Sequence, residues 1–297
     1  MTRRDWLLST LALAPVDAAG GAPSTALATD AVVLDTAAGR VKIEDVRSRV
    51  LFEHGATRTM ALPGSTLKPL VLSALLDQKL LKPDERLACP GGFHLGHHNL
   101  ECSHVHGAPP FDAVEALAAS CNFWFATMAR RLGAAGLLAA LRGFGLSAQL
   151  APSVEQAGLQ SLGLAHVTAS PWTLALAYDK LLRSGPPAPI GNGLRAVVER
   201  GTGQRALSDR VFIAGKTGTA RGERPGSSVG WFAGWAYREA PATEPRSSPA
   251  ERALNGAVKK PGDGIVFAIR VPGGTGGGEA AEQARILAER WASGHLR

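Results

Sequence analysis

Residues 63–68 read Pro63-Gly-Ser-Thr-Leu-Lys68, and an apolar stretch with helical spacing runs from Leu67 to Leu81. Ser65 and Lys68 are three residues apart, so a helix that begins here places them on one face, within reach of each other. A serine hydroxyl becomes a useful nucleophile when a neighbouring base takes its proton, and a desolvated lysine can be that base. On its own the pair is a weak signal, because Ser-x-x-Lys is common on exposed helices.

A second polar element interrupts an apolar stretch that has helical spacing from Phe111 to Leu132. Ser120-Cys121-Asn122 brings a hydroxyl and an amide into this predicted helix, and such groups need partners when buried. Two interpretations stay open. The pair relays a proton and holds a substrate amide, or it marks a kink or cap of the helix.

The third element is Ala214-Gly-Lys-Thr-Gly-Thr-Ala220, directly after the apolar run Val211–Ile213. An edge strand offers backbone donors, and a lysine with hydroxyls supplies positive potential for a carboxylate. A phosphate-binding loop is the competing interpretation, but the early glycine of that motif is missing. Arg outnumbers Lys 24 to 8, yet both motif positions are Lys. This favours a chemical role at Lys68, because arginine does not give up its proton.

The order of the predicted elements indicates an α+β fold. We expect short strands at 31–35, 40–43, 50–52, 211–213, 230–236 and 264–271, and helices at 67–81, 111–132, 170–183 and 279–292. Residues 238–263 are polar, which predicts a loop at the protein surface. Strands from both chain ends then form one sheet with helices inserted between them. We predict a domain over 30–294, with a sheet subdomain (30–66 and 195–294) and a helical subdomain (67–194).

The first 22 residues have the pattern of an export signal. Thr2-Arg-Arg4 precedes a mildly apolar stretch, Trp6–Val16, and small residues follow. Eleven residues are too few to span a bilayer, and no later segment is long enough to anchor the protein. We therefore expect an exported protein of the periplasm or cell envelope. The paired arginines suit a twin-arginine signal, and the alternative is an ordinary N-terminus with two chance arginines.

The composition is that of a soluble globular protein, with 45% hydrophobic and 19% charged residues. The formal net charge of +7 would suit an anionic partner, but no Lys/Arg-rich run interleaved with aromatic residues is present. We therefore expect no nucleic-acid partner.

Taken together and in this order, the three elements resemble the Ser-x-x-Lys, Ser-x-Asn and Lys-Thr-Gly set of penicillin-binding proteins and serine β-lactamases. The flanking sequences Cys89-Pro-Gly-Gly, Glu115–Phe125, Val167–Ala177 and Gly230–Gly234 look like class B transpeptidase domains. The resemblance covers roughly residues 30–294. It implies an antiparallel five-stranded sheet flanked by helices, an inserted all-helical subdomain, and an active site in the crevice between them.

The resemblance also implies a role for each motif residue. Ser65 would attack a D-Ala-D-Ala stem peptide of peptidoglycan or a β-lactam, with Lys68 as base and Ser120 as proton shuttle. Asn122 would hold the substrate amide, and Lys216, Thr217, Gly218 and Thr219 would bind the substrate, with the terminal carboxylate on the lysine and the two threonines. The backbone N–H groups of Ser65 and Thr219 would form an oxyanion hole, worth about 3–4 kcal/mol for each donor.

The expected activity is D,D-transpeptidation or D,D-carboxypeptidation through an acyl-serine, with no required cofactor. One alternative is a serine β-lactamase, although Glu155 and Glu199, the only glutamates between the second and third motifs, have no recognisable context for positioning a water. Another is a β-lactam or peptidoglycan sensor that does not turn over. About a dozen residues separate the leader from the first strand, so we expect neither a pedestal nor a glycosyltransferase domain. Protein partners are not predicted.

The three cysteines lie close to most of the histidines. Five of the eight histidines fall between Cys89 and His106, at positions 94, 97, 98, 104 and 106. In an oxidising compartment Cys89 and Cys102 would pair in a disulfide. The same residues offer a structural zinc site made of Cys89, Cys102, His106 and Cys121. A third possibility is that they do neither, with Cys121 as a small packing residue.

Overall fold

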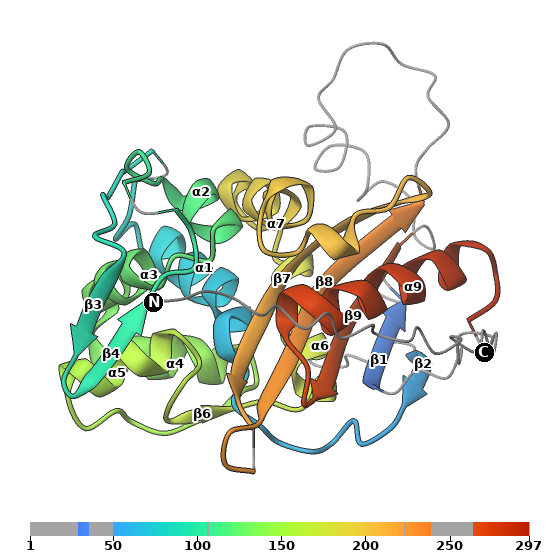
Figure 1. Cartoon of the computed structure of the whole chain (residues 1–297), viewed down its shortest axis with the longest axis horizontal. Helices are drawn as coiled ribbons and strands as arrows, with labels where there is room; N and C mark the ends of the chain where they lie inside the picture. Colours follow the sequence, from blue (N-terminus) through green and yellow to red (C-terminus); the bar gives the residue numbers. More distant parts are fainter. Residues whose placement is uncertain are drawn as a thin grey trace, which may run out of the picture.

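A computed structural model describes residues 29–35, 50–82, 84–105, 107–222, 224–238 and 264–296. The predicted export signal (1–22), the predicted strand at 40–43, His106 and residues 239–263 lie outside this part of the chain. Figure 1 shows a sheet on one side of the molecule and a group of helices on the other.

The centre of the fold is a five-stranded sheet whose neighbouring strands are all antiparallel, in the order β2-β1-β9-β8-β7. Its first two strands and its last three come from opposite ends of the chain, as predicted. The strands are β1 (Asp30–Asp35), β2 (Val50–His54), β7 (Val211–Arg221), β8 (Ser228–Arg238) and β9 (Gly264–Pro272). β7 is longer than the predicted Val211–Ile213, so the third motif lies within the strand and not after it.

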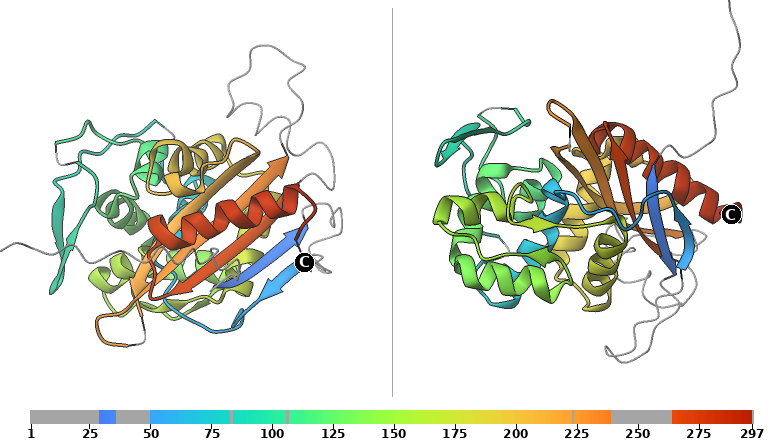
Figure 2. Two further views of the ribbon diagram at one scale, coloured as in Figure 1. Left: turned by 45° about the vertical axis from the view of Figure 1, so that its right-hand side comes forward. Right: turned by 90° about the horizontal axis from the view of Figure 1, so that it is seen from below.

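Both faces of the sheet are covered, and alternate residues of each strand serve the two faces. On β9, Ile265, Phe267 and Ile269 pack on α9 (Ala281–Ala292), whereas Val266 and Ala268 belong to the core on the opposite face. That second face is covered by α6 (Pro171–Arg183). Figure 2 shows α9 lying across one side of the sheet.

A buried ion pair joins the two halves of the sheet. Arg270 on β9 donates to Asp30 on β1, with Nη2 and Nε at 2.6 and 2.8 Å from Oδ2, and the two residues are register partners. A buried charge needs its partner, so this pair opposes slippage between β1 and β9.

The chain between β2 and β7 forms the helical part of the molecule. It begins with a 3-10 turn, η2 (Gly64–Leu67), that leads into α1 (Lys68–Asp77). The remaining helices are α2 (Ala113–Ala118), α3 (Asn122–Ala129), α4 (Gly133–Gly143), α5 (Val154–Ser161) and α7 (Ala188–Arg200), with 3-10 turns η3 (Arg130–Leu132) and η4 (Gln204–Ala206). Helix α6 starts as predicted, with Ser170 as N-cap and Pro171 in the first turn.

Two small antiparallel ribbons accompany these helices, so the inserted part of the chain is not all-helical as predicted. They are β3 (Gly92–Leu95) with β4 (His98–Glu101), and β5 (Ser147–Ala148) with β6 (Val167–Thr168). A π-helical turn, η5 (Gly276–Ala280), precedes α9. The predicted subdomain boundaries at residues 67 and 194 stay a prediction.

Candidate active site

The turn that carries Ser65 is held from several sides. Gly64 has a φ of +56°, and a Cβ built on it would lie 2.8 Å from the carbonyl oxygen of Thr219 on β7. A Cβ on Gly218 would lie 2.6 Å from the carbonyl oxygen of Pro63. The glycines therefore allow a backbone-to-backbone approach between η2 and the third motif. Ser65 itself is half-buried in this turn.

Side chains from the sheet and from α6 fix the same turn. Tyr178 on α6 donates its hydroxyl to the carbonyl of Thr66 at 2.8 Å, and Trp231 on β8 donates Nε1 to the carbonyl of Leu62 at 2.9 Å. The N–H of Gly64 donates to the carbonyl of Gly163 at 3.1 Å. Contacts from three separate elements thus position the segment on either side of Ser65.

The predicted single helix over 111–132 is wrong, because the chain breaks at the second motif. Helix α2 ends at Ala118 and α3 begins at Asn122. Ser120 has a φ of +52°, which is uncommon for a residue other than glycine, and Cys121 is the N-cap of α3. Apolar residues at 117, 118, 121 and 125 keep helical spacing through the break, so the pattern alone predicted one helix. The kink and cap are thus confirmed, and the chemical role of Ser120 and Asn122 stays a prediction.

The break points the Ser120 hydroxyl at two buried amines. Lys68 Nζ, at the start of α1, lies 3.1 Å from Ser120 Oγ, and Lys216 Nζ, from β7, lies 3.0 Å from the same oxygen. Both lysine side chains are fully buried. The first and third motifs, 148 positions apart in the sequence, therefore meet on one hydroxyl.

Further contacts orient the two amines. Lys68 Nζ also donates to the carbonyl of Ser120 at 2.6 Å and to Asn122 Oδ1 at 2.8 Å. Asn122 Nδ2 in turn donates to the carbonyl of Glu101 at the end of β4, at 3.0 Å. Lys216 Nζ donates to the carbonyl of Thr217 at 3.0 Å. The amide of Asn122 thus links Lys68 to the β3–β4 ribbon.

Burial lowers the pKa of both lysines. The pKa of Lys68 falls to about 7, chiefly because the interior disfavours the charged form. The pKa of Lys216 lies well below its usual value, through burial and then through the charge of Lys68. Two ammonium groups around one hydroxyl repel each other, which further disfavours the charged forms. The lowered pKa of Lys68 makes its neutral form, which can act as a base, available near neutrality.

The two threonines of the third motif have different surroundings. The hydroxyl of Thr217 is buried and lies 2.6 Å from that of Thr202 and 3.3 Å from Lys216 Nζ. Thr219 is exposed, and its hydroxyl accepts from the N–H of Gly276 in η5 at 2.9 Å. Thr219 is therefore the threonine of the third motif that a molecule in solution can reach.

The three cysteines lie close together at the second motif, whose middle residue is Cys121. Cys102 Sγ is 3.7 Å from Cys89 Sγ and 3.9 Å from Cys121 Sγ, and all three are free thiols. A disulfide needs an S–S length of about 2.05 Å, so the expected Cys89–Cys102 disulfide is not formed in this structure. Among the described residues His104 is the histidine beside the three sulfurs, whereas the predicted ligand His106 lies outside the described part of the chain.

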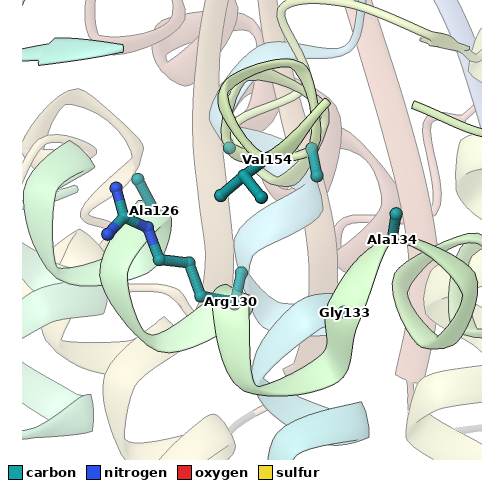
Figure 3. A pocket seen from close by; sticks show the side chains of 8 residues that line it. Ala126, Arg130, Gly133, Ala134 and Val154 are labelled. Carbon is teal, nitrogen blue, oxygen red and sulfur yellow. The ribbon is translucent and has the colours of Figure 1, made fainter. Parts of the chain in front are cut away.

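A small pocket lies elsewhere, between α3, the link to α4, and α5 (Figure 3). Its volume is about 80 Å³, and its walls are alkyl apart from Arg130. It is lined by Ala126, Ala129, Arg130, Gly133, Ala134, Val154, Ala157 and Gly158. None of the residues predicted for the site lines this pocket, so we place the candidate site at Ser120 and not here.

Comparison with known proteins identifies the family. The profile of the penicillin-binding protein transpeptidase domain matches residues 30–190 and 187–243. The chain belongs to this family. Among curated relatives, penicillin-binding protein PbpB of Mycolicibacterium smegmatis is 27% identical over 246 aligned positions, covering 62% of this chain and 37% of the relative. Penicillin-binding protein 3 of Bacillus subtilis is 26% identical over 233 positions, covering 59% and 34%. The match thus spans little more than a third of each relative.

Solved structures show the same fold. The apo transpeptidase domain of Burkholderia pseudomallei penicillin-binding protein 3 aligns with a TM-score of 0.67 at 19% identity, covering 89% of this chain and 88% of that one. Pseudomonas aeruginosa PBP2, crystallised with WCK 5153, aligns with a TM-score of 0.66 at 20% identity, covering 89% and 70%. The resemblance to class B transpeptidases and the predicted fold class are therefore confirmed.

Three residues of this transpeptidase-family site were missed from the sequence. Thr202, between two glycines after α7, contacts the third motif, whereas Tyr178 and Trp231 hold the Ser65 turn. Tyr178 and Trp231 look like ordinary core aromatics in an apolar pattern, and their hydrogen bonds connect segments that are far apart in the chain. No local sequence signal distinguishes these two aromatic residues.

Of the helices in the described part of the chain, none has the length and hydropathy that a membrane span needs.

Removing the Tyr178 hydroxyl tests how the Ser65 turn is held. We expect Tyr178→Phe to lower the free energy of unfolding by about 1 kcal/mol, because a buried hydrogen bond to Thr66 is lost without a change of shape. The measurement is urea unfolding at equilibrium. Tyr237→Phe is the matched control, since no described residue hydrogen-bonds its hydroxyl. Equal stability of Tyr178→Phe and the parent protein would contradict the assignment.

Proposed function

We propose that this chain is an acyl-serine enzyme that acts on D-Ala-D-Ala stem peptides of peptidoglycan, as a D,D-transpeptidase or D,D-carboxypeptidase, and that β-lactams acylate it. The observation that carries the proposal is the hydroxyl of Ser120 held between Lys68 and Lys216 at 3.1 and 3.0 Å. A serine becomes a nucleophile when a neighbouring base takes its proton, and the amine of Lys68 beside the Ser120 hydroxyl can be that base.

In the acylation step, Lys68 accepts the proton of Ser65 while Ser65 Oγ bonds to the carbonyl carbon of the penultimate D-Ala. The C–N bond of the terminal D-Ala then breaks, and Ser120 passes a proton to the leaving amine. Lys68 and Lys216 both contact Ser120, so the proton taken from Ser65 has a short route to that amine. The ester on Ser65 is released by water or by the amine of a second stem peptide.

Substrate binding is assigned to the third motif. Lys216 supplies positive charge for the terminal carboxylate, together with the hydroxyls of Thr217 and Thr219. Gly218 contributes by lacking a side chain, since a Cβ there would push η2 away from β7. The backbone N–H groups of Ser65 and Thr219 are the proposed oxyanion donors, and Asn122 is the proposed partner of the substrate amide.

The two glutamates between the second and third motifs favour a transferase over a β-lactamase. Glu155 is exposed on α5, and Glu199 forms an ion pair with Arg195 along α7, with Oε1 and Nε 2.7 Å apart. Neither forms a hydrogen bond or ion pair with Ser65, Lys68 or Ser120. Rapid deacylation needs a group that positions a water, so we infer that deacylation of this chain is slow.

We also infer export to the periplasm or cell envelope, where this substrate lies, on the pattern of residues 1–22.

Labelling with a fluorescent penicillin tests the nucleophile. Ser65→Ala is expected to lose covalent labelling on a denaturing gel, because no oxygen remains to form the ester. Ser73→Ala is the matched control: Ser73 is buried in α1, and its hydroxyl contacts Asp77 within the helix. It should label like the parent protein. Equal labelling of Ser65→Ala and the parent protein would rule out Ser65 as the nucleophile.

Hydrolysis of a chromogenic cephalosporin separates the two enzyme classes. We expect a burst of about one product molecule per chain followed by slow turnover, because the acyl-enzyme persists. The rate is followed by absorbance in the steady state. Fast multiple turnover that disappears in Ser65→Ala would assign the chain to the β-lactamases instead.

Acylation should depend on pH through Lys68. Only the neutral amine can accept the Ser65 proton, so the rate should fall as the pH drops through about 7, the lowered pKa of Lys68. The measurement is the second-order rate of penicillin labelling across neutrality. Lys68→Arg should be inactive throughout, because its guanidinium stays protonated. A flat profile would remove Lys68 as the base.

A further inference from the structure

Four side chains of the kinds that ligate metals lie close together at the second motif. Cys89 precedes β3, Cys102 and His104 follow β4, and Cys121 caps α3. One ligand atom from each of these residues lies within 4.8 Å of all the others. The cluster thus draws on the two chain segments that enter and leave the β3–β4 ribbon at its open end, and on the helix that starts at the second motif.

The spacing of the sulfurs matches a tetrahedral metal site. With Zn–S bonds of about 2.3 Å, tetrahedral geometry puts two thiolate sulfurs about 3.8 Å apart. The distances from Cys102 Sγ to Cys89 Sγ and to Cys121 Sγ are 3.7 and 3.9 Å. A disulfide between Cys89 and Cys102 would need a much shorter contact. It would also leave Cys121 and His104 without a role.

The imidazole of His104 provides an independent observation. Its Nδ1 lies 3.1 Å from the carbonyl of Val105, whereas its Nε2 is buried and has no hydrogen-bond partner within the described part of the chain. The ring is also held edge-on against Phe111, with centroids 4.8 Å apart. A metal-ligating histidine characteristically donates one ring N–H to a carbonyl and keeps the other nitrogen for the metal. The buried lone pair of Nε2 therefore needs a ligand.

We propose that Cys89, Cys102, His104 and Cys121 bind a structural zinc ion in a closed Cys3His site. Three soft thiolates and one imidazole form a ligand set that zinc prefers, and four protein ligands leave no open position for chemistry. Each cysteine gives up its thiol proton to solvent on binding. The proposal stands on these four residues and does not depend on the acylation reaction.

The site would position the second motif. Cys121 lies between Ser120 and Asn122, so an ion bound to its sulfur fixes the backbone where α2 gives way to α3. The carbonyl that accepts from Asn122 belongs to Glu101, the neighbour of Cys102. One ion would therefore hold both the break that exposes the Ser120 hydroxyl and the ribbon that orients Asn122.

The test is metal content and metal spectroscopy on the full chain. Zinc per chain is measured by elemental analysis for the parent protein, for His104→Ala and for His98→Ala. His98 is an exposed histidine on β4 of the same ribbon and lies outside the cluster, so it is the matched control. The absorption spectrum after replacement by Co²⁺ reports thiolate ligation and tetrahedral geometry, and it needs no variant.

We expect close to one zinc per chain in the parent protein and in His98→Ala, and thiolate-to-cobalt charge-transfer bands. His104→Ala should lose at least about tenfold in zinc affinity. Unchanged affinity in His104→Ala, a parent chain that binds no zinc when it is supplied, or a Cys89–Cys102 disulfide in the purified protein would overturn the proposal. If His104→Ala does not fold, the cobalt spectrum of the parent protein decides. Penicillin labelling of Ser65 is read separately, so failure of one proposal does not imply failure of the other.

Discussion

The structure depends on one shared hydroxyl. Ser120 Oγ accepts from Lys68 and Lys216, two fully buried amines, one at the start of α1 and the other in the middle of β7, the edge strand of the sheet. Burying a cation is costly unless it is partnered, and burying two of them together is worse. The cost is reduced because burial lowers the pKa of both, and because carbonyls of Ser120 and Thr217 accept from them. A neutral amine at Lys68 is also what the proposed proton abstraction from Ser65 needs.

The rest of the fold brings three distant segments to that hydroxyl. Glycines at 64 and 218 let the Ser65 turn approach β7 closely, and α6 and β8 hold the turn through Tyr178 and Trp231. The break between α2 and α3 then turns Ser120 inward at a φ that residues other than glycine rarely adopt. Such local strain persists because the surrounding contacts determine it. The antiparallel sheet supports these contacts, and the Asp30–Arg270 ion pair fixes the register between β1 and β9.

Sequence patterns predicted the parts of this arrangement that are local. The N-cap of α6 and the apolar runs of β8 and β9 were predictable, because short-range periodicity and capping determine them. The three motifs identified the residues that meet at Ser120. The helix break was only one of two open interpretations, because the apolar spacing continues through it: Cys121 is as buried at the N-cap of α3 as it would be within a continuous helix. Thr202 and His104 were missed because only tertiary structure selects one threonine or one histidine among several.

We propose that Ser65, three residues before Lys68, is the residue that forms the acyl ester. The most direct measurement is mass spectrometry of the protein after reaction with benzylpenicillin, first intact and then after digestion. The account predicts one added penicilloyl group per chain, carried by the peptide that contains Ser65. An adduct on another residue, or no adduct on correctly folded protein, would contradict it.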